Sequence, residues 1–364
     1  MNQIPESSNL DVPRDVTETL IGLVGQYSPS GSETVAVDWA VSRMSELGYS
    51  RAFRDEAGNA VGLMGDGPRQ VVLLGHIDTV PGNIPLHRKG DLLFGRGTVD
   101  AKGALAAFVD AVSRIGLRPG WQFVVIGAVG EEGSSEGARY VAERLRPVYA
   151  VIGEPSGWDR VTLGYKGSAW ADVTLSRALA HSAGPIPSAC EAAVALWQAI
   201  CHWAEEYNRG RAKAFERVVP SLRGMTSERG DFDEWASLQI AARLPADLGP
   251  QGWFSALEDI CVAGDALVTP VGFAIPAFRA DKNNPLVRAM VSSIRLQGGT
   301  PGFLLKTGTA DLNIVAPAWG CPALAYGPGN SALDHTAEEH ISLAEFGLAV
   351  DILEGALRSL VQAH

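Results

Sequence analysis

Three short apolar runs, at residues 71–74, 123–126 and 149–152, most restrict the folds open to this chain. Four apolar residues with no polar residue between them predict a strand that is buried on both faces. Apolar residues at helical spacing follow the first two runs, at residues 104–115 and 135–145. Strands that alternate with helices in this way predict an α/β fold with a largely parallel sheet.

The pattern changes after residue 167. Residues 168–175 and 237–244 alternate apolar and polar side chains, which is typical of strands with one exposed face. With 364 residues, the chain is also longer than one ordinary hydrophobic core requires. We therefore expect a catalytic domain, residues 1–167 and 276–364, that is interrupted by an inserted α+β domain at residues 168–275.

Charge and composition argue against several classes of protein. The formal net charge of −11 does not favour a general binder of nucleic acid or anionic membranes. The polar N-terminus lacks the apolar segment of a signal peptide, and no run of about 18 apolar residues predicts a membrane span. The four cysteines form no C-x-x-C pair, which favours reduced thiols. We expect a cytoplasmic protein.

Each apolar run is followed by a glycine and then by a potential metal ligand. His76 follows the first run, Glu131 and Glu132 follow the second, and Glu154 follows the third. Sites in open α/β sheets form at the carboxyl ends of the strands, so these side chains are expected to converge. Asp78 points the same way as His76 and is expected to orient its imidazole ring.

Two further candidates lie on loops: Asp100, just before a helix, and His335, in the sequence Asp334-His335-Thr336. Two histidines with several carboxylates favour zinc or a similar divalent ion. The carboxylates outnumber the needs of one ion, and a bridging carboxylate suits a two-metal site. Other interpretations exist for single residues: Asp100 as the partner of a helix N-terminus, Glu131 and Glu132 as a solvated pair, and Glu154 as a turn residue.

Five motifs carry a resemblance to a known family: GHIDTVPG, GRGTVDAKG, GAVGEEGSSEGAR, GEPSG and HTAEEHI. Together, and in this order, they resemble the dinuclear-zinc family of acetylornithine deacetylase, succinyl-diaminopimelate desuccinylase and glutamate carboxypeptidase. The resemblance implies two divalent ions per subunit, zinc or cobalt, and hydrolysis of an amide bond. The implied metal ligands are His76, the bridging Asp100 and Glu154 for one ion, and Asp100, Glu132 and His335 for the other.

The resemblance also implies roles for other residues. Glu131 would be the general base, and Asp78 would support His76. His181, in LAHSAG, matches the family's lid histidine, which reaches the neighbouring subunit of a homodimer and donates to the oxyanion. Arg243 matches the lid arginine that binds a substrate carboxylate. The alternative for His181 is an ordinary surface histidine.

The substrate is indicated by two strings, GEPSGWDRVTLGYKG and KTGTADLN. They look most like the branch of the family that releases lysine or ornithine from the glutamate of a small acidic amino-group carrier protein, in lysine or arginine biosynthesis. A basic stretch at residues 207–229, with six Lys or Arg and two Glu, would suit an acidic partner, although a solvated surface explains it equally well. Lys306 and Asp311 are candidates for the substrate pocket, and Asp311 alternatively caps a helix. The alternative function is a deacylase of a free small molecule, such as acetylornithine or succinyl-diaminopimelate.

Overall fold

The computed structural model describes residues 14–181 and 183–362. The polar segment 1–13, on which the expectation about a signal peptide rests, lies outside these residues. Within the described ranges, no helix is long and apolar enough to cross a membrane.

The chain forms two compact units. The first unit comprises Met1–Leu163, Ala280–Leu304 and Ile314–His364, and the second comprises Gly164–Arg279 and Leu305–Asn313. The predicted insert, residues 168–275, lies within the second unit, which also takes in a short segment from the later part of the chain. The two units are described separately below.

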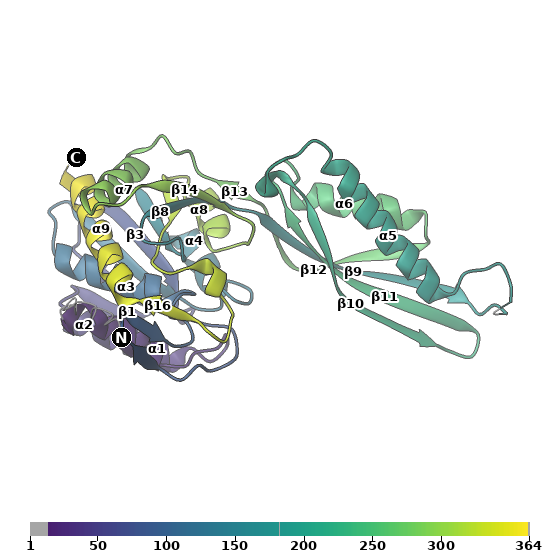
Figure 1. The fold of residues 1–364 in the computed structure, drawn as a ribbon, viewed down its shortest axis with the longest axis horizontal. Helices are drawn as coiled ribbons and strands as arrows, with labels where there is room; N and C mark the ends of the chain where they lie inside the picture. Colours follow the sequence, from purple (N-terminus) through teal and green to yellow (C-terminus); the bar gives the residue numbers. More distant parts are fainter. Residues whose placement is uncertain (1–13, 182, 363–364) are drawn as a thin grey trace, which may run out of the picture. The chain divides into compact units, whose positions relative to one another are not determined.

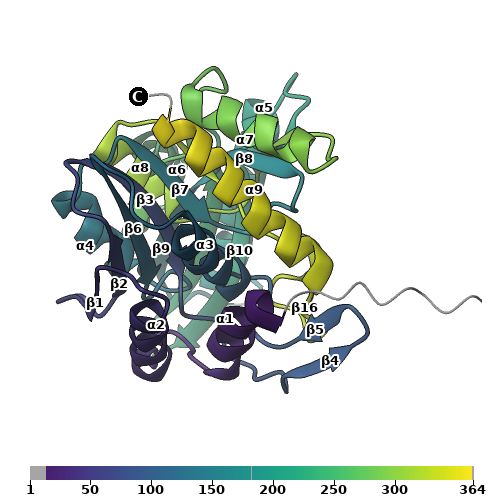
Figure 2. The ribbon, with the colours of Figure 1, turned by 90° about the vertical axis from the view of Figure 1, so that its left-hand side faces the viewer.

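A nine-stranded sheet has four parallel strands at its centre, in the order β6, β3, β7 and β15. Strand β3 is labelled in Figure 1, and β6 and β7 are labelled in Figure 2. The three apolar runs form β6, β3 and β7, where nearly every side chain is buried. Antiparallel strands extend both edges, so the predicted parallel sheet is confirmed at its centre. The strands are β1 (Arg51–Arg54), β2 (Ala60–Met64), β3 (Arg69–His76), β6 (Trp121–Ala128), β7 (Tyr149–Gly153), β8 (Arg160–Tyr165), β13 (Phe278–Arg279), β14 (Gly302–Lys306) and β15 (Ala323–Ala325).

Helices pack on this sheet and on one another. Helix α3 contacts the parallel strands through a face of small and apolar residues, and α9 lies against both α3 and α7 (Figure 2). Gly22 of α1 lies so close to Trp39 of α2 that a Cβ atom would fall 1.8 Å from the indole ring. The helices of the first unit are α1 (Arg14–Gly25), α2 (Thr34–Glu46), α3 (Lys102–Ile115), α4 (Glu136–Arg144), α7 (Pro285–Leu296), α8 (Leu312–Trp319, which begins in the second unit) and α9 (Leu343–Gln362).

A separate three-stranded sheet in the first unit joins distant parts of the chain. Strand β5 (Leu92–Phe94) pairs with both β4 (His87–Lys89) and β16 (His340–Ser342). The segment after β5 leads to Asp100, and the segment before β16 contains His335. This pairing therefore brings two loops with predicted ligands close together.

The second unit contains a four-stranded antiparallel sheet in the order β10, β11, β9 and β12. From Ala236 to Leu244, every second side chain of β11 is buried, because α5 and α6 cover one face of the sheet. Ser188 and Glu191 form a capping box at the start of α5. The bounds are β9 (Gly167–Ala178), α5 (Ala189–Tyr207), β10 (Val219–Arg229), β11 (Asp233–Leu244), α6 (Pro250–Val262) and β12 (Ala266–Ile275).

Candidate metal centre

The ligands predicted from the apolar runs lie at neighbouring strand ends. In the parallel pairing, His76 of β3 stands opposite Ala128 of β6, and Gly75 stands opposite Gly153 of β7. The loop with Glu131 and Glu132 follows β6, and Glu154 follows β7 directly. The carboxyl ends of three adjacent strands thus form one edge of the site, as the sequence predicts.

Asp100 lies between the two predicted histidine ligands. Its Oδ1 atom is 3.2 Å from Nε2 of His76, and its Oδ2 atom is 3.0 Å from Nε2 of His335. One carboxylate therefore directs one oxygen to each imidazole ring, which is the arrangement that a bridging metal ligand requires. The residues that meet here are 24 and 235 positions apart in the sequence.

Two groups of potential ligand atoms lie within 4.8 Å in the described residues. One group contains Asp100, Glu132 and His335, and the other contains His76, Glu131 and Glu132. The first is the set predicted for one ion. The second shares only His76 with the set predicted for the other ion. Glu154 is buried, with 7 % of its surface exposed, and belongs to neither group.

The electrostatics of the centre suit divalent cations. Burial opposes a charge on His76, but hydrogen bonds with Asp100 and Asp78 raise its pKa well above the usual value. Hydrogen bonds with Asp100 and Glu132 raise the pKa of His335 to about 10. The pKa of Asp100 is lowered despite its burial, because His335 and His76 both donate to it. Clustered carboxylates thus favour positive charge at this place, and the residues fit a pair of divalent ions.

Asp78 contacts more of the centre than predicted. The Nδ1 atom of His76 lies 3.0 Å from the main-chain oxygen of Asp78, and 3.5 Å from its carboxylate. The carboxylate accepts hydrogen bonds from the main-chain N–H groups of Glu131 and Glu132, both at 3.1 Å, and from the hydroxyl of Ser30 at 2.7 Å. Asp78 therefore holds the Glu131–Glu132 turn as well as the imidazole ring.

His181 and Arg243 lie in the second unit. His181 is exposed, and its Nδ1 atom accepts the main-chain N–H of Ala183 at 3.2 Å, which leaves Nε2 as the donor of a neutral ring. Arg243 is on β11, and its guanidinium donates to the hydroxyl of Thr309 at 2.7 Å. Thr309 in turn donates to the main-chain oxygen of Lys166 at 3.2 Å.

The two pocket candidates of the KTGTADLN segment differ in exposure. Lys306 is partly exposed, with its ammonium 5.8 Å from the centre of the Tyr165 ring. Asp311 is 1 % exposed and directly precedes α8. Asn313 fastens this segment, because its side chain donates to the main-chain oxygens of Pro276 and Lys166 and accepts the N–H of Ala310.

A comparison with protein-family models places the chain among known proteins. Residues 72–359 match the model of peptidase family M20/M25/M40. The chain belongs to this family. Members are metal-dependent hydrolases of amide bonds, and the matched residues include every predicted ligand of the centre.

Curated relatives in the family cover nearly the whole chain. The chain is 44 % identical to the LysW-lysine hydrolase of Deinococcus radiodurans over 341 residues, which is 92 % of this chain and 94 % of that protein. It is 29 % identical to the LysW-lysine/LysW-ornithine hydrolase of Sulfurisphaera tokodaii, over 95 % of this chain and 96 % of the relative. The chain thus resembles hydrolases that are named for LysW-linked lysine and ornithine.

Solved structures show the same fold. An M20-family metallo-carboxypeptidase from Sulfolobus solfataricus superposes with a TM-score of 0.77 at 16 % identity, over 96 % of this chain and 99 % of the other. A tripeptidase from Staphylococcus aureus also gives a TM-score of 0.77, at 18 % identity, over 95 % and 98 % of the two chains. The predicted fold class is therefore confirmed.

Several residues around the family's metal centre had no predicted role. Lys102 is fully buried at the start of α3, donates to the main-chain oxygen of Gln26 at 2.6 Å, and interacts electrostatically with Asp78 and Glu339. Arg96 and Glu339 form a buried ion pair at 2.8 Å. Arg96 and Lys102 lie in the GRGTVDAKG motif, and Glu339 lies in HTAEEHI. Their charge inside these motifs was the only sequence feature that could have pointed to a role near the metal centre.

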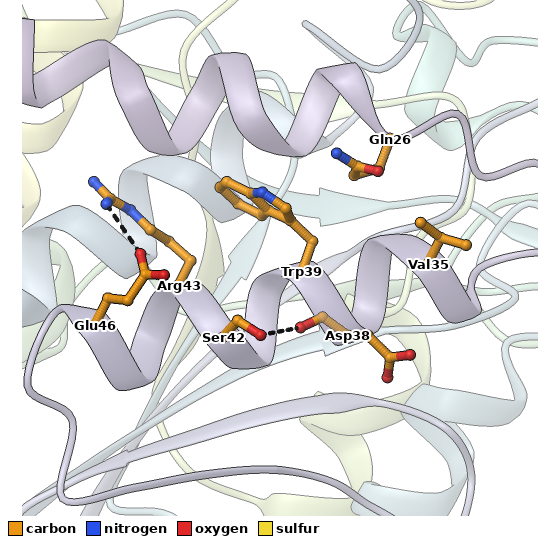
Figure 3. A pocket seen from close by; sticks show the side chains of 7 residues that line it. All are labelled: Gln26, Val35, Asp38, Trp39, Ser42, Arg43 and Glu46. Carbon is orange, nitrogen blue, oxygen red and sulfur yellow. Dashed lines mark hydrogen bonds and ion pairs between the residues drawn. The ribbon is translucent and has the colours of Figure 1, made fainter.

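A pocket between α1 and α2 has a volume of about 320 Å³ (Figure 3). Trp39 stands in its middle, with Arg43 and Glu46 on one side and Gln26 and Val35 on the other. None of its lining residues belongs to the metal centre. The pocket offers no group of converging catalytic side chains.

Proposed function

We propose that this family member hydrolyses the amide that joins lysine or ornithine to the glutamate side chain of an acidic amino-group carrier protein. The reaction class is carried by one observation, the position of Asp100 between His76 and His335. The substrate is supported by the relatives named for LysW-lysine and LysW-ornithine, whose sequences align with nearly the whole chain. Such a biosynthetic step, together with four free cysteines, supports a cytoplasmic setting.

The proposed ligands are those implied by the family: His76, Asp100 and Glu154 for one ion, and Asp100, Glu132 and His335 for the other. Two divalent ions, zinc or cobalt, would lower the pKa of water and polarise the amide carbonyl. Glu131 is the proposed base that takes a proton from the attacking water and passes it to the leaving amine. The carboxylate of Asp78 holds Glu131 in place by accepting a hydrogen bond from the main-chain N–H group of Glu131.

Residues of the second unit are proposed to bind the substrate. The exposed Nε2–H group of His181 is suited to donate to an oxyanion, and a homodimer would supply it from the neighbouring subunit. Arg243 donates to the hydroxyl of Thr309, and its planar guanidinium has the fork geometry that suits a substrate carboxylate. Lys306 and Asp311 stay candidates for the amino-acid end of the substrate.

Three of the six basic residues in the stretch at 207–229 already form ion pairs within the chain. Arg209 pairs with Glu206, Arg211 pairs with Asp247 at 2.7 Å, and Lys213 pairs with Glu216 at 3.3 Å. Such pairs reduce the positive field available to a partner, and this observation favours the alternative, a deacylase of a free small molecule.

Three other arginines of the basic stretch are exposed: Arg217 lies just before β10, and Arg223 and Arg229 lie on β10. In the described part of the chain, no ion pair joins Arg217, Arg223 or Arg229 to a carboxylate. We propose these three residues as the docking surface for the acidic carrier.

The two functions are separated by one substrate panel. Purified protein with defined zinc or cobalt is incubated with carrier-linked lysine, carrier-linked ornithine, acetylornithine and succinyl-diaminopimelate, and released amino acid is measured. The proposal expects turnover of one or both carrier substrates at a kcat/KM far above that of the small molecules. Preferential turnover of a small acyl compound would establish the alternative instead.

A further inference from the structure

Glu339 lies four residues after the proposed ligand His335 and is 1 % exposed. It directly precedes β16, which lies beside β5 in the small sheet (Figure 2). The main-chain oxygen of Glu339 accepts the N–H of Gly95 at 3.3 Å. The pairing of β16 with β5, together with this hydrogen bond, places the Glu339 side chain beside the segment that leads from β5 to Asp100.

Both carboxylate oxygens of Glu339 accept hydrogen bonds from that segment. Its Oε1 atom accepts the main-chain N–H groups of Val99 at 2.9 Å and Asp100 at 3.2 Å. Its Oε2 atom accepts the main-chain N–H of Gly97 at 3.1 Å and the guanidinium of Arg96 at 2.8 Å. Four donors around one buried carboxylate fix the path of the backbone up to the bridging residue.

Arg96 extends this contact to a third loop. Its Nε atom donates to the main-chain oxygen of Gly82 at 2.9 Å. Gly82 lies in the loop after β3, the strand that carries His76. The Arg96–Glu339 pair therefore joins the loop that follows His76 to the segments that carry Asp100 and His335.

We propose that Glu339 is a positioning residue that sets Asp100 relative to His76 and His335. The inference rests on the proposed function, because it assumes that these three side chains bind metal. Carboxylates of a metal centre repel one another, so the backbone that presents them has to be held by other contacts. Residues behind the ligands that fix their orientation typically change metal affinity about 10- to 100-fold when they are altered.

The variant Glu339→Gln tests this role because its side chain has nearly the same shape. A carboxamide has one acceptor oxygen, so its NH₂ group has to face either the N–H groups of Val99 and Asp100 or those of Gly97 and Arg96. Two of the four contacts are lost in either orientation. Glu338→Gln is the matched control. It makes the same chemical change one residue away, at a side chain that is exposed.

Cobalt(II) chloride is titrated calorimetrically into the metal-free full-length proteins, and the visible absorption of bound cobalt is recorded. We expect two equivalents with equal affinity and spectrum in wild type and Glu338→Gln. In Glu339→Gln we expect affinity about 10- to 100-fold weaker, a changed spectrum and an unchanged far-UV circular dichroism. Wild-type affinity and spectrum in Glu339→Gln would overturn the inference alone, whereas a wild-type protein that binds no cobalt would refute the proposed function as well.

A second variant decides the matter if Glu339→Gln does not fold. Arg96→Lys keeps the positive charge but loses the planar group that reaches both Gly82 and Glu339. Weaker cobalt binding and a shifted spectrum in this variant support the positioning role. A folded Arg96→Lys protein with the affinity and spectrum of wild type overturns it.

Discussion

The carboxylate of Asp78 accepts the main-chain N–H of Glu131 at 3.1 Å. This bond connects the loop after β3 with the loop after β6, and it fixes the backbone of the proposed base. The interaction does not depend on the side chain of Glu131, so a substitution at Asp78 tests the position of the base without changing the base itself.

Asp78→Asn should lower kcat by about 10- to 100-fold. The asparagine keeps one acceptor oxygen, so the N–H of Glu131 or that of Glu132 loses its partner. Ser30→Ala removes only the hydroxyl donor to Asp78, and its effect should be smaller. Steady-state kinetics on the carrier-linked substrate give both values. An Asp78→Asn enzyme with full kcat would show that the turn is held by other contacts.

Glu131→Gln should lower kcat by about 10²- to 10⁴-fold, because the amide does not take up the proton from water. Metal stoichiometry, measured by elemental analysis, should stay at the wild-type value. Glu143→Gln on the exposed side of α4 is the control and should have full activity. Substantial turnover by Glu131→Gln would disprove the proposed base.

Reversing the charges of Arg217, Arg223 and Arg229 to Glu should raise KM for the carrier substrate about 10-fold or more at low salt. Turnover of a small acyl-lysine should not change, since its binding needs no docking surface. The double variant Arg209→Glu, Lys213→Glu removes cations that already bind carboxylates, and its effect should be smaller. Equal KM values for wild type and the triple variant, at every salt concentration, would remove the docking role.

The pH dependence of the free energy of unfolding should show the lowered pKa of Lys166. Burial, with a smaller contribution from Arg243, lowers the pKa of Lys166 to about 8, against 10.5 for an exposed lysine. Between these pH values the unfolded chain binds a proton that the folded chain has released, so raising the pH favours the folded state.

Denaturant unfolding at pH 7.5 and 9.5 measures this effect. The free energy of unfolding of wild type should rise relative to that of Lys166→Met over this interval. Other titrating groups are common to both proteins and cancel in the difference. Parallel pH profiles for the two proteins would contradict the lowered pKa.

Local patterns were enough to predict the centre of the sheet and the convergence of candidate ligands at its strand ends. The apolar runs before His76 and Glu131 are signals within single segments, and the strand-end rule then brings them together. The contact of Asp78 with His76 was predicted, but its hydrogen bonds with Glu131 and Glu132 were not. These bonds involve main-chain N–H groups, which every residue type except proline has, so the sequence gives no sign of them. The pairing of Arg211 with Asp247 was hidden for a different reason, since Asp247 lies outside the basic stretch.

Glu339 shows most clearly what the sequence does not reveal. Its acidic neighbour Glu338 is exposed, and nothing in the local sequence distinguishes the two. Only the pairing of β16 with β5, across about 250 residues, selects Glu339 for the interior. Such long-range pairing is decided by the whole fold.

The contacts of Glu339 with residues some 240 positions earlier also order events during synthesis. A ribosome releases the chain from its N-terminus, so His76, Asp100 and Glu131 emerge long before His335 and Glu339. A nascent or truncated chain that ends before residue 335 has neither the second imidazole nor the support of Asp100. The proposed metal centre is therefore expected to assemble only after residue 339 has been made, long after the strand that carries His76.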